Sequence, residues 1–530
     1  MLELEAASWV LLTALLGPLF WKAARHARNE HAAAPLLVLL GLTVVARLAV
    51  PFAPPNWYMG TTEVGAFFTR ATAVIPLPSR LALSVARDEL GIRTLNLAFS
   101  LGSVLLFWFT AARAGHTRRT ALVFAGFFAL VPMYVRLAAS DDGVVTALLF
   151  LFSVAAAARV ELQDPGGAPW AWPLLALAIV LAMPLRLESG VLVPLVGFFG
   201  CRDRISWRGF FPSPAVAVTV LLATAVGAWR MLELHHQSMG VHAVNALGLA
   251  NALIGGVLFI VNPAGPQFFS PLLAVPIWIF VVRRWRARDF AGLVALYVPV
   301  LLARVPTIFN DGPFVMLPAA RYHVLSVVFI LLASARAIDE LPAWFARRPV
   351  RVAGALLLGP VAWVTLVVPG RFTYAYQEEY LFLRQALPRE GTVVTLWDPL
   401  PGRNDLDCCL ALPSQRLNAQ FPGLRWVVLG AGVTEAELAA VSADFYYPGS
   451  MSSLDPSSLD VWWRKLVAPP ETRALHRAHI ARLRALDQQL RARFSPEPVA
   501  ARGVPAHTFS DVGFRDDWLP LEFLARRQAR

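Results

Sequence analysis

Acidic side chains that could transfer protons gather in two polar stretches between long apolar segments. These stretches are Pro54–Leu90 and Arg136–Asp142. Their acids are Glu63, Asp88 and Glu89 in the first stretch and Asp141 and Asp142 in the second. A carboxylate held at a membrane surface can act as a general base toward a hydroxyl or an amine. We predict that Glu63 and the two acids of the second stretch are catalytic, and that the other two acids support them.

These acids also have a simpler interpretation. Acids in short external loops can be solvated without any further role. Ser140, Asp141 and Asp142 stand directly before an apolar segment, where such side chains make good helix N-caps. For Asp141 taken alone, the N-cap is the favoured interpretation.

Arginine side chains lie inside or beside the apolar segments, where burying a guanidinium is costly unless it is paired or faces water. They are Arg47, Arg186, Arg304 and Arg321. Glu188 follows Arg186 by two residues, and Tyr322 follows Arg321. A guanidinium can hold a phosphate through parallel hydrogen bonds, so we predict phosphate binding by Arg186, Arg321 and Tyr322, with Glu188 in support. The alternative is a buried structural ion pair, and Arg47 could instead extend to the membrane interface.

The segments that must position these residues are strongly apolar. Hydrophobic residues make up 57% of the chain and charged residues 15%, and the mean hydropathy is +0.55. A helix needs about 20 apolar residues to cross a hydrocarbon core of about 30 Å. Suitable windows are 6–21, 34–52, 91–112, 120–138, 143–158, 210–229, 267–282, 290–308, 314–334 and 352–369. The sequence predicts a polytopic α-helical membrane domain over residues 1–370, with about 10–12 spans.

One further apolar segment, 173–200, is interrupted by Pro184, Arg186, Glu188 and Pro194. Basic loops stay on the cytoplasmic side of a membrane. These loops are Lys22–His31, Arg113–Arg119, Cys201–Gly209, Arg283–Asp289 and Arg336–Arg351. Placing all of these loops on the cytoplasmic side requires that 173–200 enters the membrane and returns to the same side, as a broken half-helix pair. The acidic loops and everything after Pro369 are then extracytoplasmic, which predicts a multi-pass protein of a cell (inner) membrane with a periplasmic tail.

The tail, residues 371–530, has the composition of a soluble mixed α/β domain. Strands are expected at Thr392–Trp397, Arg425–Leu429 and Asp444–Tyr447, and helices at Glu435–Val441 and Glu471–Arg493. The tail shows no nucleophile–base pair. A role as a lid or in docking an acceptor over the membrane site is expected.

Neither a cofactor nor a metal is predicted. The sequence lacks CxxC and HExxH spacings, and the absence of a GxxxxGK[ST] loop disfavours a nucleotide-hydrolysing pump. The formal charge of +12 requires no nucleic acid, because most of the excess lies in loops facing the anionic cytoplasmic leaflet.

The arrangement resembles the GT-C superfamily of membrane glycosyltransferases, and most of all the bacterial relatives of protein O-mannosyltransferases and of the lipid A aminoarabinose transferase. The resemblance covers about residues 1–370. It rests on the long first loop, on Ala139-Ser-Asp-Asp-Gly, on the break Pro184-Leu-Arg-Leu-Glu and on Ala320-Arg-Tyr-His. It implies transfer of a sugar from a polyprenyl-phosphate donor to a lipid, glycan or protein acceptor outside the membrane. By position, Glu63, Asp141 or Asp142 would be the acids and Arg186 or Arg321 the phosphate ligands.

The first loop departs from the family, because Asn56-Trp-Tyr-Met-Gly-Thr-Thr-Glu supplies only Glu63 where members usually show an aspartate, often paired with another acid. Two alternatives to a transferase therefore stay open. A transporter or flippase for a lipid-linked or polyanionic substrate would show inverted repeats with broken helices in both halves. The other alternative is a catalytically degenerate member that keeps the fold as a scaffold.

Overall fold

A computed structural model describes most of the apolar part of the chain and the core of the tail. The described residues are 2–50, 76–86, 89–139, 143–163, 168–186, 188–200, Phe211, 213–235, 246–261, 274–304, 323–339, 382–383, 385–386, 388–396, Phe421, 423–448, 470–504 and 519–526. The expected span 352–369 and the first half of the long acidic loop lie outside this part.

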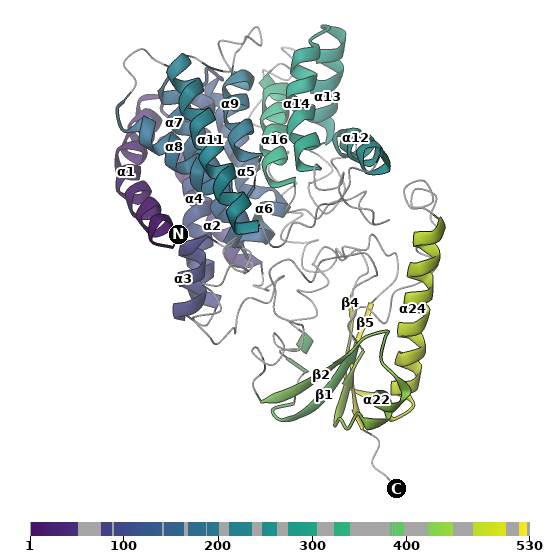
Figure 1. Ribbon diagram of the computed structural model, residues 1–530. Coiled ribbons are helices and arrows are strands. Elements are labelled where there is room, and N and C mark those ends of the chain that lie inside the picture. Colours follow the sequence, from purple (N-terminus) through teal and green to yellow (C-terminus); the bar gives the residue numbers. More distant parts are fainter. Residues whose placement is uncertain are drawn as a thin grey trace.

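The described residues are mostly helical, and the helices of the apolar part form one bundle (Figure 1). They are α1 (Leu2–Asn29), α2 (Ala33–Ala49), α3 (Leu77–Ala86), α4 (Glu89–Arg113), α5 (Arg118–Leu130), α6 (Pro132–Ala138), α7 (Gly143–Glu161), α8 (Ala171–Ala182), α9 (Ser189–Gly200), α11 (Pro214–His235), α12 (Ala246–Val261), α13 (Ala274–Arg286), α14 (Phe290–Ala303) and α16 (Val324–Asp339). Every expected apolar window in the described part contains at least one of these helices.

Three described helices are long and apolar enough to cross a membrane: Glu3–Asn29, Leu90–Arg113 and Val144–Glu161. Other apolar helices are shorter, among them α2, α8, α11 over Pro214–Arg230, and α14. By length and composition, these three helices could cross a membrane, as the sequence predicts for the segments that contain them. The full count of about 10–12 spans stays a prediction.

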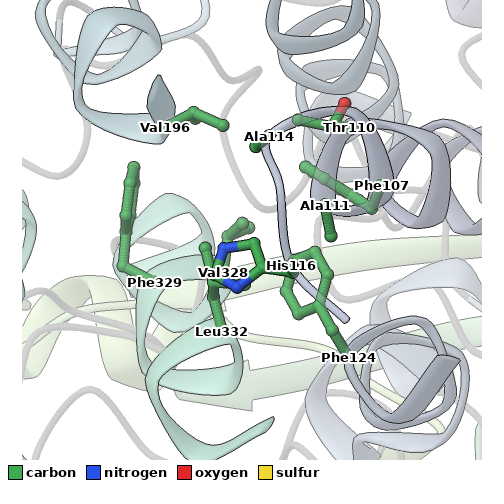
Figure 2. A pocket seen from close by; sticks show the side chains of 10 residues that line it. All are labelled: Phe107, Thr110, Ala111, Ala114, His116, Phe124, Val196, Val328, Phe329 and Leu332. Carbon is green, nitrogen blue, oxygen red and sulfur yellow. The ribbon is translucent and has the colours of Figure 1, made fainter. Parts of the chain in front are cut away.

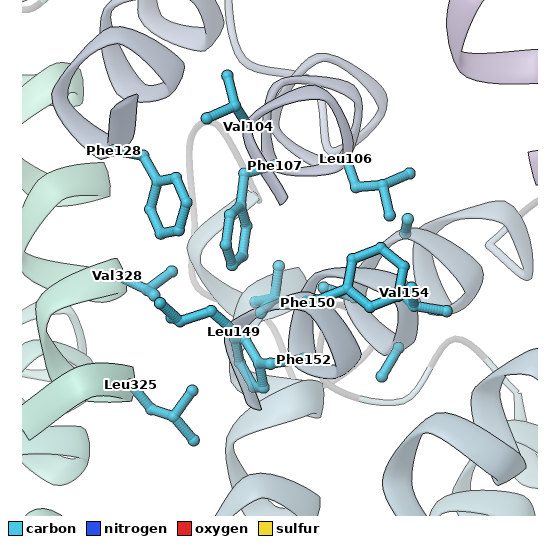
Figure 3. Packing of buried hydrophobic residues seen from close by; sticks show 14 of the residues in the cluster. Val104, Leu106, Phe107, Phe128, Leu149, Phe150, Phe152, Val154, Leu325 and Val328 are labelled. Atoms are coloured by element: carbon cyan, nitrogen blue, oxygen red, sulfur yellow. The ribbon is translucent and has the colours of Figure 1, made fainter. Parts of the chain in front are cut away.

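The centre of the bundle is built from α4, α5, α7 and α16. Figure 3 shows Phe107 of α4, Phe128 of α5 and Phe152 of α7 meeting beside Val328 of α16. The ring centroid of Phe107 lies 4.6 Å from that of Phe128 and 6.3 Å from that of Phe152. Such offset aromatic contacts add to the free energy gained by burying the rings. They hold the helices that carry the polar residues described below.

The outer faces of the peripheral helices expose large apolar side chains instead. Val38 of α2 and Leu222 of α11 are each 62% exposed, and Trp21 of α1 is 67% exposed. By contrast, nearly all of α7 and α16 is buried. An extended apolar exterior is unfavourable in water and suits contact with lipid chains.

Buried ion pairs fasten the end of the bundle where α1 finishes. The Glu161 carboxylate at the end of α7 is fully buried, forms an ion pair with Lys22 of α1, and accepts a hydrogen bond from Nε of Arg113 at 3.1 Å. Thr117 and Asp339 join the start of α5 to the end of α16 by a side-chain hydrogen bond. The contacts of Glu161 link α1, α4 and α7, and the bond of Thr117 links α5 to α16.

The helix boundaries correct the sequence expectations at two places. The expected single span 120–138 is divided into α5 and α6, because Pro132 has no backbone N–H to continue the helix. The helix α12 was not among the expected apolar segments. The expected interruption of 173–200 is present, since α8 ends at Ala182 and α9 begins at Ser189.

The described core of the tail is the expected mixed α/β structure. Its strands are β1 (Gly391–Leu396), β2 (Leu424–Leu429), β3 (Phe445–Tyr447), β4 (Phe494–Val504) and β5 (Leu519–Arg526), and its helices are α22 (Glu435–Ala440) and α24 (Pro470–Arg491). The sheet has the order β2-β1-β3-β5-β4, with β1 parallel to β2 and β3, and β5 antiparallel to β3 and β4. The strands β4 and β5 were not expected. In Figure 1 the sheet lies beyond the end of the bundle where α1 begins and α3 lies.

Candidate functional site

Three of the sequence-predicted site residues lie in the described part of the chain. They are Arg186, Glu188 and Glu89. Glu89 is the first residue of α4 and therefore begins a long apolar helix. The other predicted residues lie outside the described part, namely Glu63, Asp88, Asp141, Asp142, Arg321 and Tyr322. No described contact tests their roles.

Arg186 and Glu188 occupy the break between α8 and α9. The Arg186 backbone N–H still donates to the Ala182 carbonyl at 2.9 Å, and the Ser189 hydroxyl donates to the Arg186 carbonyl at 2.7 Å. The Glu188 carbonyl accepts the first bond of α9, from the N–H of Leu192 at 3.0 Å. The break is therefore hydrogen-bonded at both ends, which fixes the backbone that carries both charges. The two charges attract each other.

A second arginine, Arg304, terminates α14 and is completely buried. Its guanidinium lies against the backbone of α12 at Gly255. A Cβ atom at Gly255 would stand only 2.1 Å from Nη2 of Arg304, so the absence of a side chain at this residue makes the close approach possible. On the same two helices, the Tyr297 hydroxyl donates to the Leu253 carbonyl at 2.9 Å. The position of Arg304 thus depends on how α12 packs against α14.

The start of α16 brings a histidine to these arginines. His323 is 1% exposed, and its Nδ1 lies 3.1 Å from the Ser326 hydroxyl. The helices α9, α14 and α16 pack against one another, which brings the three segments that carry Arg186, Arg304 and His323 together. The positive charges of Arg304 and Arg186 both reach the His323 ring. We call Arg186, Arg304 and His323 the basic cluster. Arg321, the expected phosphate ligand, precedes His323 by two residues in the sequence.

Two buried polar side chains support the elements around this cluster. The Tyr134 hydroxyl in α6 donates to the Val324 carbonyl at 2.7 Å, which holds α6 to the first turn of α16. Asn96 of α4 donates to the Ala138 carbonyl at 3.2 Å and accepts a hydrogen bond from the Thr146 hydroxyl at 2.6 Å. In the sequence, Ala138 precedes and Thr146 follows the pair Asp141–Asp142. Asn96 therefore fixes both ends of the chain segment that carries the two aspartates.

A buried ionic group lies at the start of α3. The Glu5 carboxylate of α1 pairs with Arg80 of α3 at 2.5 Å and with Arg230 of α11 at 3.3 Å. Its other oxygen accepts a hydrogen bond from the N–H of Leu77 at 3.1 Å. The first turn of α3 is thereby anchored to α1 and α11. Because α3 lies within the acidic stretch Pro54–Leu90, after Glu63 in the sequence, this anchor fixes the second half of that stretch.

The enclosed pocket in Figure 2 is separate from the basic cluster. It is lined mostly by apolar side chains of α4, α5, α9 and α16, together with His116, and its volume is about 10 Å³. A cavity of this size holds at most one water molecule. It is therefore too small for a substrate. Within the described residues, no group of three His, Cys, Asp or Glu side chains could hold a metal ion.

The tail contains a buried polar network that joins its helix α24 to its sheet. The Tyr446 hydroxyl donates to Oδ1 of Asp487 at 2.6 Å, and Arg491 donates to the same carboxylate through Nε and pairs with Glu522. Burial, together with the negative charge of Asp487, raises the pKa of Tyr446 well above its usual value. Tyr446 is therefore a neutral hydrogen-bond donor that joins β3 to α24.

Comparison with models of protein families and with curated proteins finds no match. The geometry of the described residues must therefore carry the functional argument. Sequence reasoning did not identify Asn96 or Tyr134, although each is a polar residue in an apolar stretch, a pattern that often marks a buried hydrogen bond.

Proposed function

We propose that the chain is a multi-pass membrane glycosyltransferase. It transfers a sugar from a polyprenyl-phosphate donor to an acceptor on the extracytoplasmic face of a cell membrane. The observation that carries this proposal is the basic cluster, in which Arg186, Arg304 and His323 converge from three segments among apolar helices. A lipid-linked phosphate is an anion that the bilayer itself delivers to such a place. Arginine is the side chain best suited to bind it.

The proposed reaction assigns a role to each group. The acceptor oxygen or nitrogen attacks the anomeric carbon of the sugar, the bond from that carbon to the phosphate oxygen breaks, and polyprenyl phosphate leaves. Glu63, or an acid of the second acidic stretch, takes the proton of the acceptor. The basic cluster, with Arg321, stabilises the negative charge that grows on the departing phosphate. The anchors at Asn96 and Glu5 hold the two acidic stretches that supply the base.

The proposed topology follows from the charges. The basic loops lie in the cytoplasm, whereas α3, the acidic stretches and the tail lie outside. The ion pair of Glu161 and Lys22 is then at the cytoplasmic end of the bundle, and the Glu5 group is at the outer end. The tail sheet lies beyond the end of the bundle where α1 begins, in agreement with this orientation (Figure 1).

The proposal is tested by binding of polyprenyl phosphate to the full-length protein in lipid nanodiscs. We expect Arg186→Met and Arg304→Met each to weaken binding about tenfold, since each removes charge-assisted hydrogen bonds to the phosphate. The double variant should lose less than the product of the two effects, because both residues contact one ligand.

The matched control is Arg47→Met. Arg47 is also a buried arginine, but it donates to the Ala129 carbonyl at 2.7 Å in another part of the bundle. This variant should lose thermal stability and keep its affinity for polyprenyl phosphate. If Arg186→Met and Arg304→Met behave in the same way, the basic cluster is structural and the proposed function is wrong.

A further inference from the structure

An apolar groove opens on the outside of the bundle between α1, α2 and α4. Its volume is about 500 Å³, and every residue that lines it is apolar. Phe20 of α1 and Leu105 of α4 form its walls, and Gly41 of α2 contributes part of its floor. A Cβ atom at Gly41 would have no neighbour within 4 Å, which shows that the space above this residue is open.

The groove has the direction and length of a lipid chain. On α2 it extends from Leu37 to Val44, which is about 10 Å along a helix axis. One leaflet of a bilayer contributes about 15 Å of hydrocarbon, so the groove covers much of that depth. On α2 it ends one turn from the first residue of the helix, Ala33, and thus near the connection between α1 and α2.

Basic side chains lie at the connection between α1 and α2, near this end of the groove. Arg28 follows Phe20 by two helical turns and lies about 80° from it around α1, and its side chain is exposed. Arg118, at the start of α5, donates to the His31 carbonyl at 2.5 Å, which brings a second guanidinium to the α1–α2 connection. We call Arg25, Arg28, Arg118 and Arg119 the basic rim; all four are exposed. Glu30 is an acid at the same end, so the rim keeps a net positive charge.

We propose that the groove binds one acyl chain of an anionic glycerophospholipid whose phosphate contacts the basic rim. The apolar lining fits the chain, and the rim complements the charge of the headgroup, as basic sites between membrane helices do for anionic lipids. A zwitterionic lipid fills the groove equally well but gains less from the rim. The site is distinct from the basic cluster, so this inference does not depend on the proposed transferase activity.

The experiment is native mass spectrometry of the delipidated full-length protein, titrated with phosphatidylglycerol or phosphatidylcholine of identical acyl chains. Gly41→Phe fills the groove, and we expect it to remove the tightest phosphatidylglycerol site. Arg28→Gln removes one cation of the rim and should weaken that site about fivefold while leaving phosphatidylcholine binding unchanged. Gly17→Phe is the control, because a side chain at Gly17 also meets open space but does not line the groove.

Four results overturn the inference. The first is unchanged phosphatidylglycerol binding in Gly41→Phe, and the second is an equal loss in Gly17→Phe. The third is a change of oligomeric state in Gly41→Phe with lipid binding unaltered, which would make the groove an interface between copies of this chain. Equal affinity of the wild-type protein for both lipids would remove the role of the basic rim and contradict the inference as stated.

Discussion

At the scale of single residues, the placement of the basic cluster depends on one glycine. Arg304 is completely buried and reaches its position because α12 has no side chain at Gly255. The cost of burying a guanidinium makes such a position unfavourable unless charge or hydrogen bonding compensates for it. Arg304 has partners within the protein, and a phosphate bound beside it would add a further favourable charge interaction, which a binding assay can detect.

We therefore predict that Gly255→Ala weakens binding of polyprenyl phosphate about tenfold, because the new methyl group displaces the Arg304 guanidinium. Alanine is the better helix former by about 1 kcal/mol, so the helix itself is not weakened by propensity. Gly17→Ala, where a Cβ meets open space, is the control and should leave binding unchanged. Unchanged affinity in Gly255→Ala would argue that Arg304 does not contact the ligand.

Residue-level prediction from sequence succeeded where the signal was local. Arg186 and Glu188 stand beside Pro184 within an apolar run, so both the break and its charges could be predicted. The approach of Arg304 to His323 could not be predicted from the sequence, because it depends on how α12, α14 and α16 pack against one another. Neither hydropathy nor spacing encodes that packing.

At the scale of elements, short polar anchors position the acidic stretches. Asn96 is completely buried in α4 and bonds to Ala138 and Thr146, on the two sides of the aspartate pair of the second acidic stretch. A displacement of a catalytic group by about 1 Å can lower turnover about 10²-fold.

Asn96→Leu should accordingly lower the rate of sugar transfer about 10²-fold while leaving the affinity for polyprenyl phosphate unchanged. The measurement compares transfer and binding on the same preparation. Thr146→Val, which removes one of the two hydrogen bonds, should show a smaller effect of the same kind. An equal loss of binding and transfer would instead indicate general damage to the fold.

The helix α22 in the tail gives a prediction about pH. Thr434 and Glu437 form a capping box, in which the Glu437 carboxylate accepts hydrogen bonds from the backbone N–H and the hydroxyl of Thr434. These bonds, the backbone one foremost, lower the pKa of Glu437 below its usual 4.5. The stabilisation of α22 by these hydrogen bonds is therefore complete above about pH 4.5, and it is lost as the pH falls through the lowered pKa of Glu437.

Hydrogen exchange of the α22 amides in the full-length protein should show this loss of protection on acidification. Thr434→Val removes the hydroxyl and should lower the protection at neutral pH and reduce its pH dependence. Glu435, in the same turn, is the control residue, because it takes no part in the capping box. A variant Glu435→Gln with the same effect as Thr434→Val would contradict this explanation.

Element boundaries could be predicted where hydrophobic runs are long. Every described window of membrane-crossing length contains a helix. The break at Pro132 was missed because hydropathy does not respond to a lost backbone N–H. The helix α12 was missed although its sequence is strongly apolar. The strands β4 and β5 carry prolines and charges, which mask the alternation expected of a strand.

At the scale of the whole molecule, the distribution of polarity suits a helical bundle surrounded by lipid. Apolar side chains cover the periphery, whereas charged and polar groups lie between helices. The ionic group at Glu5 and the pairs at Glu161 lie at opposite ends of α1.

The most direct test of the proposed function is the release of polyprenyl phosphate from polyprenyl-phosphate-linked hexoses and pentoses by the purified, reconstituted full-length protein. The account predicts acceptor-dependent release by the wild-type chain and a rate about 10²-fold lower for Glu63→Gln, because the general base is lost. Arg304→Met should also lower the rate, and Arg47→Met should lower it only as far as stability falls. Absence of acceptor-dependent release with every such donor, in a protein that is folded and binds polyprenyl phosphate, would contradict glycosyl transfer.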